Sequence, residues 1–199
     1  MIFTLGKRYE YPYRLLYDRK VWPNYDEILD NLPHASLYVH NPASRHCGPG
    51  RSSFSLVARQ LERLQPRQRA IWEAVRDQLH APALAEHLAT KLVVRRRPLV
   101  PFATLCRDTK GHFIDVHPDW DRKIITVQFY LPRDESLRDT GTDIYDESKR
   151  WVRRLEFLPN TAYCFARSET SYHGLREIKN DIVRDSLMLT YYGEPFDEY

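Results

Sequence analysis

The sequence has no long apolar run and few cysteines. No stretch of its 199 residues approaches the ~20 consecutive apolar residues that a membrane-spanning helix needs. The first residues, MIFTLGKRYEYPYR, lack the apolar segment of a secretory signal peptide. The three cysteines, Cys47, Cys106 and Cys164, are widely spaced and form no C-x-x-C pair, which argues against a disulfide framework or a thiolate zinc site. We therefore expect a cytoplasmic protein with no membrane partner.

An excess of charge of one sign is also missing. The 30 basic and 27 acidic residues leave a net charge of +3, and the basic residues show no continuous stripe with interleaved aromatics. We therefore expect no nucleic-acid partner. The many tyrosines and phenylalanines, 13 and 8 respectively, suit a β-rich core. A chain of this length can bury the core of one domain, so we treat residues 1–199 as a single domain.

The first part of the chain has mainly helical patterns. Apolar side chains recur at helical spacing in residues 25–32, and residues 34–50 contain several turn signals and are expected to be a loop. Residues 51–92 are predicted to be helical, with an apolar stripe followed by helices that open at Pro66 and Pro82. The stripe consists of Phe54, Leu56, Val57, Leu61 and Leu64.

From about residue 94 the apolar side chains alternate along the chain, as is typical of strands. Turn signals separate the strands, which we expect near residues 99–107, 112–117, 123–131, 151–157, 161–167, 170–177 and 182–192. Short strands after a helical block predict an α+β fold. Its core would be a double-stranded β-helix, or jelly roll, over residues 94–199, with the mainly helical residues 1–93 packed on one outer face.

The stretch IDVHPDWD, residues 114–121, places a histidine and a carboxylate two residues apart at the end of a predicted strand. Side chains alternate along a strand, so His117 and Asp119 are in phase. The next strand, KIITVQFYLP, has one wholly apolar face and a second face that is polar but uncharged, which suits the lining of a concave site. The residues of this second face are Ile124, Thr126, Gln128 and Tyr130.

The end of the chain, SYHGLREIKNDIVRDSLMLTYY, predicts a hairpin that turns near residues 179–181 and sets His173 opposite Arg184. An arginine in so apolar a run needs an anion, because a buried unpaired charge is costly. A ligand carboxylate would make a bidentate contact with the guanidinium group and accept a further hydrogen bond from the Ser186 hydroxyl. Arg184 could instead pair with a neighbouring acid such as Asp115.

Together, His117, Asp119 and His173 make a two-histidine, one-carboxylate set, the arrangement that leaves open positions on non-heme Fe(II). Each part also has a structural interpretation, because the first two could be a turn pair and the third an ordinary half-buried histidine. A cupin-like metal enzyme and a non-catalytic β-sandwich binding module are the alternative functions. Cupins usually supply His-x-His and a nearby glutamate, whereas this chain has an aspartate at the second position.

The chain resembles the Fe(II)/2-oxoglutarate-dependent oxygenases, whose pattern is His-x-Asp, a distal histidine and, shortly after it, Arg-x-Ser. The matching segments here read HPD, YHG and RDS. The segment YEYPYRLLYDRKVWPNYDEILDNLP resembles the N-terminal strand and helix of the family. KGHFIDVHPDWDRKIITVQFYLP and FLPNTAYCFARSETSYHG resemble its core strands. The resemblance covers most of the chain and is weakest over residues 34–92.

The resemblance implies a hydroxylase that uses Fe(II), 2-oxoglutarate and O2 and acts on a small molecule. The metal ligands, which are also the catalytic residues, would be His117, Asp119 and His173. The far carboxylate of 2-oxoglutarate would meet Arg184 and Ser186, with Tyr130 as a further hydrogen-bond donor. The cosubstrate would be converted to succinate and CO2.

Two further expectations come with the resemblance. Halogenating relatives have a small residue in place of the metal-binding aspartate, so Asp119 favours hydroxylation. Substrate specificity in this family lies in loops, here residues 34–50 and 133–150, and the mixed charges of the second segment predict a mobile lid.

Overall fold

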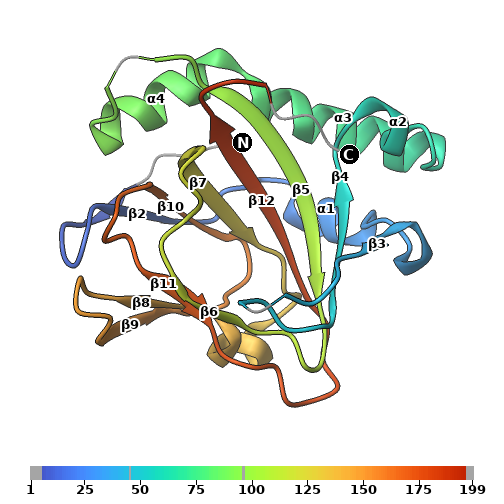
Figure 1. The fold of residues 1–199 in the computed structure, drawn as a ribbon. Coiled ribbons are helices and arrows are strands. Elements are labelled where there is room, and N and C mark those ends of the chain that lie inside the picture. Colours follow the sequence, from blue (N-terminus) through green and yellow to red (C-terminus); the bar gives the residue numbers. More distant parts are fainter. Residues whose placement is uncertain (1–5, 45, 96, 196–199) are drawn as a thin grey trace.

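The computed structural model describes residues 6–44, 46–95 and 97–195, which form two antiparallel β-sheets (Figure 1). Within these residues the larger sheet has eight strands in the order β1-β2-β10-β7-β12-β5-β4-β3. Their bounds along the chain are Lys7–Tyr9 (β1), Leu15–Arg19 (β2), Val39–His40 (β3), Arg51–Ser55 (β4), Val100–Asp108 (β5), Lys123–Tyr130 (β7), Thr161–Ala166 (β10) and Arg184–Tyr192 (β12).

The smaller sheet has the order β6-β11-β8-β9. Its strands are Ile114–His117 (β6), Thr142–Tyr145 (β8), Trp151–Leu155 (β9) and His173–Leu175 (β11). From β5 onward the chain passes back and forth between the two sheets, which is the jelly-roll arrangement predicted for this part of the sequence. Each strand expected from residue 99 onward has a counterpart in the structure, with somewhat different bounds.

The helices are Tyr25–Asp30 (α1), Ala58–Leu61 (α2), Pro66–His80 (α3) and Pro82–Leu92 (α4), with 3-10 helices at Ala35–Leu37 (η1) and Glu135–Thr140 (η2). Pro66 and Pro82 open α3 and α4 as predicted, because proline fits the first helical position. Figure 1 shows these two helices running beside β5 and β12 of the larger sheet. No helix in the described residues is long and apolar enough to span a membrane.

The larger sheet has a different apolar cluster on each face. Val127 of β7 belongs to the cluster that also contains Trp72 of α3 and Leu88 of α4. Tyr130 belongs to a second cluster, with Phe157 and other residues that lie toward the smaller sheet. Alternation along β7 therefore divides its side chains as the sequence predicts, except that Ile124, expected on the polar face, belongs to the first cluster. The face toward the smaller sheet can therefore build a site.

The prediction that residues 51–92 are helical throughout is wrong at its start. Arg51–Ser55 form β4, which pairs with β5 and sets Phe54 opposite Leu105. Phe54 and Leu56 are two residues apart, a spacing that suits one face of a strand better than one face of a helix. Strands β1 to β4 all join the larger sheet, so the first 93 residues supply strands as well as helices.

The predicted hairpin near residues 179–181 is also wrong. His173 lies in the smaller sheet, opposite His117 and Ile144. Arg184 lies in the larger sheet, opposite Asp108. The chain between them crosses from one sheet to the other, because consecutive strands of a jelly roll need not be neighbours.

Residues 133–150 are not the lid that their charges suggest. They contain η2 and the core strand β8, whose Asp143 is fully buried. Arg154 Nη2 and Arg176 Nε each lie 2.9 Å from Asp143 Oδ2. Charges of both signs therefore indicate ion pairs within the fold here, and not a solvated loop.

Candidate metal centre

The three predicted metal ligands, distant in sequence, lie together in the structure. β6 and β11 pair so that His117 is opposite His173, with the centres of the two imidazole rings 4.5 Å apart. Asp119 follows β6, and its Oδ1 lies 3.9 Å from His173 Nε2. One ligand atom from each of the three residues falls within 4.8 Å of the others. A single ion could therefore reach all three.

In both histidines, Nε2 is the ring nitrogen available to an ion held by the three residues. His117 Nδ1 lies 2.8 Å from the carbonyl oxygen of Asp115, and His173 Nδ1 lies 3.0 Å from that of Ser171. A carbonyl oxygen only accepts hydrogen bonds, so each Nδ1 carries a hydrogen and Nε2 is the nitrogen that can bind a metal. Such a contact to the far nitrogen is typical of metal-binding histidines.

The charges of the site favour the metal-binding forms. Burial lowers the pKa of His173 to about 4, against the opposing charge of Asp119, so its imidazole is neutral at pH 7. Burial would raise the pKa of Asp119, but the Lys123 ammonium, His173 and a hydrogen bond from Thr126 bring it below its usual range. Lys123 Nζ lies 2.7 Å from Oδ1, and the Thr126 hydroxyl donates to Oδ2 at 2.5 Å. Neutral imidazoles and a carboxylate are the forms that bind a divalent cation.

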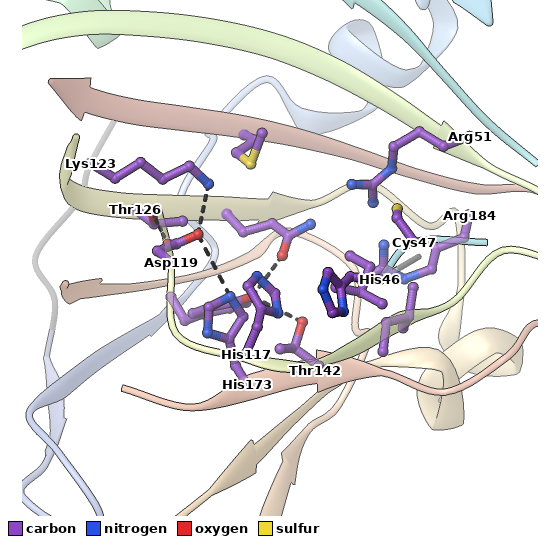
Figure 2. Close-up of a pocket in the computed structure, with 16 residues that line it drawn as sticks. His46, Cys47, Arg51, His117, Asp119, Lys123, Thr126, Thr142, His173 and Arg184 are labelled. Atoms are coloured by element: carbon purple, nitrogen blue, oxygen red, sulfur yellow. Dashed lines mark hydrogen bonds and ion pairs between the residues drawn. The ribbon is translucent and has the colours of Figure 1, made fainter. Parts of the chain in front are cut away.

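The ligands line a cavity of about 250 Å³ between the sheets. Thr126 and Gln128, from the polar face of β7 that the sequence singled out, also line it. Figure 2 shows the metal ligands on one side of this cavity and Arg51 and Arg184 at the other end. The cavity therefore joins a metal-binding group of residues to a cationic end.

Arg184 pairs with a different acid from the one suggested by the sequence. Its side chain is 1% exposed, and Nη1 lies 2.8 Å from Asp108 Oδ2 while Nε donates to the carbonyl oxygen of Thr140 at 2.8 Å. Asp115 lies at the surface, 3.5 Å from His46. Because Arg184 also lines the cavity, its ion pair and a contact with a ligand can coexist.

Several solved structures share this arrangement of strands. The chain aligns with a prolyl-4-hydroxylase of Pseudomonas putida over 91% of its own length and 93% of that protein's, with a TM-score of 0.63 and 15% identity. It aligns with HygX of Streptomyces hygroscopicus, solved with nickel and 2-oxoglutarate bound, over 93% of its own length and 85% of that protein's, with a TM-score of 0.59 and 13% identity. It also aligns with an oxidoreductase of the 2OG-Fe(II) oxygenase family from Burkholderia pseudomallei, over 90% of its own length and 84% of that protein's, with a TM-score of 0.54 and 15% identity. The chain has the fold of the Fe(II)/2-oxoglutarate oxygenases. No protein-family model and no curated protein sequence matches it.

Two residues predicted to bind the cosubstrate lie behind the cavity of this oxygenase fold. Ser186 is fully buried, and its hydroxyl accepts a hydrogen bond from Gln128 Nε2 at 3.2 Å. The Tyr130 hydroxyl donates to Thr142 Oγ1 at 2.8 Å. Among the described residues, neither Ser186 nor Tyr130 lines the cavity. Their direct contact with a cosubstrate stays a prediction.

Sequence reasoning missed other residues that line this cavity. Tyr163 lines it, with its hydroxyl 2.6 Å from Gln128 Oε1 and 2.9 Å from Thr142 Oγ1. Alternation along the strand that contains Tyr163 puts it on one face with Phe165, but only the pairing with β7 sets it opposite Gln128. Arg51 also lines the cavity. Because Arg51 was expected to lie in a helix and not in β4, the sequence did not indicate that it lines the cavity.

Proposed function

We propose that this chain is an Fe(II)- and 2-oxoglutarate-dependent oxygenase that hydroxylates a small-molecule substrate and forms succinate and CO2. The observation that carries the proposal is a single cavity with the His-Asp-His set on one side and the Arg184 guanidinium at the other end. The fold supports it, since HygX has the same fold and was crystallised with nickel and 2-oxoglutarate.

The side chains fit a non-heme iron. His117 and His173 offer imidazole nitrogens and Asp119 a carboxylate oxygen, the donor set that binds Fe(II) and leaves positions open. The half-buried Cys47 thiol lies away from these ligands, near Arg51 and Arg184, so the set contains no thiolate (Figure 2). When bound, the iron would supply the activation of O2 and the oxidation of the substrate.

The cavity also suits a dicarboxylate cosubstrate. 2-Oxoglutarate has a keto acid at one end, which can chelate a metal, and a carboxylate at the other end, which needs a cationic partner. Arg184 offers that partner, and its planar guanidinium group matches a carboxylate. Its rigid support by Asp108 and Thr140 would hold the cosubstrate in a fixed orientation.

The remaining residues favour one reaction type. Asp119 keeps a carboxylate at the position where halogenating relatives have a small residue, so hydroxylation is the proposed outcome. The walls of the cavity, which include Ile114, Leu175 and Met188, would keep water away from the reacting atoms. The substrate would enter from the side of the metal ligands and touch the protein without binding the metal.

The central test is 2-oxoglutarate turnover with added Fe(II), measured as succinate formed. Wild type should produce succinate, and His173→Ala should abolish both this activity and the binding of Fe(II), because one of three ligands is lost. His40→Ala removes an exposed histidine of β3 and should behave as wild type. Wild-type protein that bound no divalent metal would rule the proposal out.

The same assay tests the cosubstrate site. Arg184→Ala should raise the 2-oxoglutarate concentration needed for half-maximal turnover by tenfold or more, since a charge-assisted pair is lost. The maximal rate should change less. An unchanged requirement would remove Arg184 from the site while leaving the metal assignment in place.

A further inference from the structure

The cationic end of the cavity contains a second arginine that shares the buried carboxylate of the first. Arg51 Nε and Nη2 lie 2.6 and 2.9 Å from Oδ1 and Oδ2 of Asp108. Arg184 Nη1 lies 2.8 Å from Oδ2 of the same aspartate. Asp108 is fully buried, while both arginines line the cavity. The Asp108 carboxylate therefore holds both guanidinium groups at the wall of the same cavity.

This cluster carries a net positive charge. Burial would raise the pKa of Asp108, but Arg51 and then Arg184 lower it to about 2, so the group is a carboxylate. The neighbouring His112 has Nε2 3.6 Å from Asp108 Oδ1, and burial lowers its pKa, which keeps it neutral. Burial also raises the pKa of the adjacent Cys106 thiol. Two cations thus face one anion, and one positive charge remains without a partner in the cluster.

Each arginine also keeps donors for a ligand. The hydrogen bonds of Arg184 use Nε and Nη1, and those of Arg51 use Nε and Nη2. Within the described residues, Arg184 Nη2 and Arg51 Nη1 have no hydrogen-bond partner. Figure 2 shows the two guanidinium groups at the same end of the cavity. Their free N–H groups and the surplus charge suit a carboxylate.

We propose that Arg51 is a second anion-binding residue, which together with Arg184 binds the distal carboxylate of the dicarboxylate cosubstrate, and that Asp108 positions both guanidinium groups. This inference rests on the proposed function. Arg51 comes from β4, outside the strands that carry the sequence pattern of the oxygenases. It makes the cationic end selective for an acid long enough to span the cavity from the metal ligands.

A nearby ion pair of the same geometry provides the matched control. Arg107 Nε and Nη2 lie 2.8 and 2.9 Å from the two carboxylate oxygens of Asp185. The Arg107 side chain is 19% exposed and that of Arg51 is 16% exposed. Arg107 precedes Asp108 in β5, so it points to the other face of the sheet and does not line the cavity. Arg51→Gln and Arg107→Gln therefore remove equivalent ion pairs, only one of which faces the cavity.

The experiment measures the binding of two acids to nickel-loaded protein by calorimetry. In this proposal 2-oxoglutarate spans the cavity from the metal ligands to the arginines, whereas oxalate, which has no distal carboxylate, chelates the metal alone. Arg51→Gln should weaken 2-oxoglutarate binding about tenfold, the size of one lost charge-assisted contact, and leave oxalate binding unchanged. Arg107→Gln should bind both acids as wild type does. Arg51→Lys, which keeps the charge without the planar fork, should fall between wild type and Arg51→Gln.

The outcomes separate this inference from the proposed function. If wild type binds 2-oxoglutarate and Arg51→Gln binds it equally well, Arg51 has only a structural role and the inference is wrong, although the proposed function stands. Equal weakening of both acids would also overturn it, since the whole cavity would then be distorted. If nickel-loaded wild type binds neither acid, the proposed function itself fails. Circular dichroism of each variant checks the fold, and Arg51→Lys replaces Arg51→Gln if the latter does not fold.

Discussion

The ammonium group of Lys123 competes with a metal for the same carboxylate oxygen. Lys123 Nζ lies 2.7 Å from Asp119 Oδ1, the oxygen that also lies 3.9 Å from His173 Nε2. The Lys123 side chain is only 17% exposed, so solvent screens this pair weakly. A divalent ion at the three ligands would face a nearby positive charge, and like charges repel strongly in such a site.

Replacing this lysine should therefore strengthen metal binding. We expect Lys123→Met to raise the affinity for Fe(II) or nickel about tenfold, measured by calorimetry, because a competing cation of similar length is removed. The metal-free variant should also unfold at a lower temperature, since the Asp119 carboxylate loses its partner. Lys110→Met, which alters an exposed lysine paired with Asp181, should leave metal affinity unchanged. Weaker metal binding by Lys123→Met would show that the lysine orients Asp119 and does not compete.

The grouping of His117, Asp119 and His173 could be predicted from the sequence, but the two-arginine cluster could not. His117 and Asp119 are two residues apart, and a distal histidine with a following arginine completes a recognisable pattern. Asp108 and Arg51 are separated by 57 residues and share no pattern. Only the pairing of β4 with β5, which sets Arg51 opposite Asp108, brings them together. A contact that depends on strand register is invisible to local spacing.

The connection between η2 and β8 is the element that fixes the cationic end of the cavity. Thr140 ends η2 and supplies the carbonyl oxygen that accepts from Arg184 Nε, while Thr142 begins β8 and lines the cavity. Gly141 lies between them. A Cβ atom at Gly141 would lie 1.8 Å from the carbonyl oxygen of Leu155, so the two chain segments could not keep their present distance.

A side chain at this glycine should disturb both stability and cosubstrate binding. We expect Gly141→Ala to cost about 1–3 kcal/mol in the free energy of unfolding, as overpacking usually does, measured by urea denaturation. The affinity for 2-oxoglutarate should fall as well, because the support of Arg184 moves. Gly193→Ala is the control: its Cβ would meet only Ile124 Cδ1 at 3.5 Å, and its stability should stay within about 0.5 kcal/mol of wild type. Equal effects of the two changes would contradict the role given to Gly141.

Elements with strong local signals were predictable, and those that depend on tertiary pairing were not. Pro66 and Pro82 mark the first turns of two helices whatever the rest of the chain does. β8 is a short strand in a charged segment, and its Asp143 can be buried because Arg154 and Arg176 pair with it and Trp151 Nε1 donates to it. Local composition therefore pointed to a loop where long-range ion pairs make a core strand.

At the scale of the whole molecule, the larger sheet separates an outer apolar cluster, which it shares with the helices, from an inner cluster beside the cavity. The outer cluster joins the sheet to α3 and α4 and contains Leu88, which is fully buried. The inner cluster lies beside the cavity and contains Phe157, also fully buried. The Phe157 ring centre lies 4.5 Å from the central guanidinium carbon of Arg184, a cation–π contact. Loss of packing should therefore have different consequences on the two faces.

A pair of core variants tests this separation. Leu88→Ala should lower the free energy of unfolding by about 2–5 kcal/mol, because it leaves a cavity in the outer cluster. The folded fraction should still bind nickel and 2-oxoglutarate as wild type does. Phe157→Leu makes a smaller packing change, but it removes the ring that faces Arg184, so 2-oxoglutarate binding should weaken about threefold to tenfold. Urea denaturation and calorimetry on the same samples separate the two effects. Because Leu88 belongs to the outer cluster, a loss of cosubstrate affinity in Leu88→Ala without a change in Phe157→Leu would mean that the helices, and not the inner cluster, hold Arg184 in place.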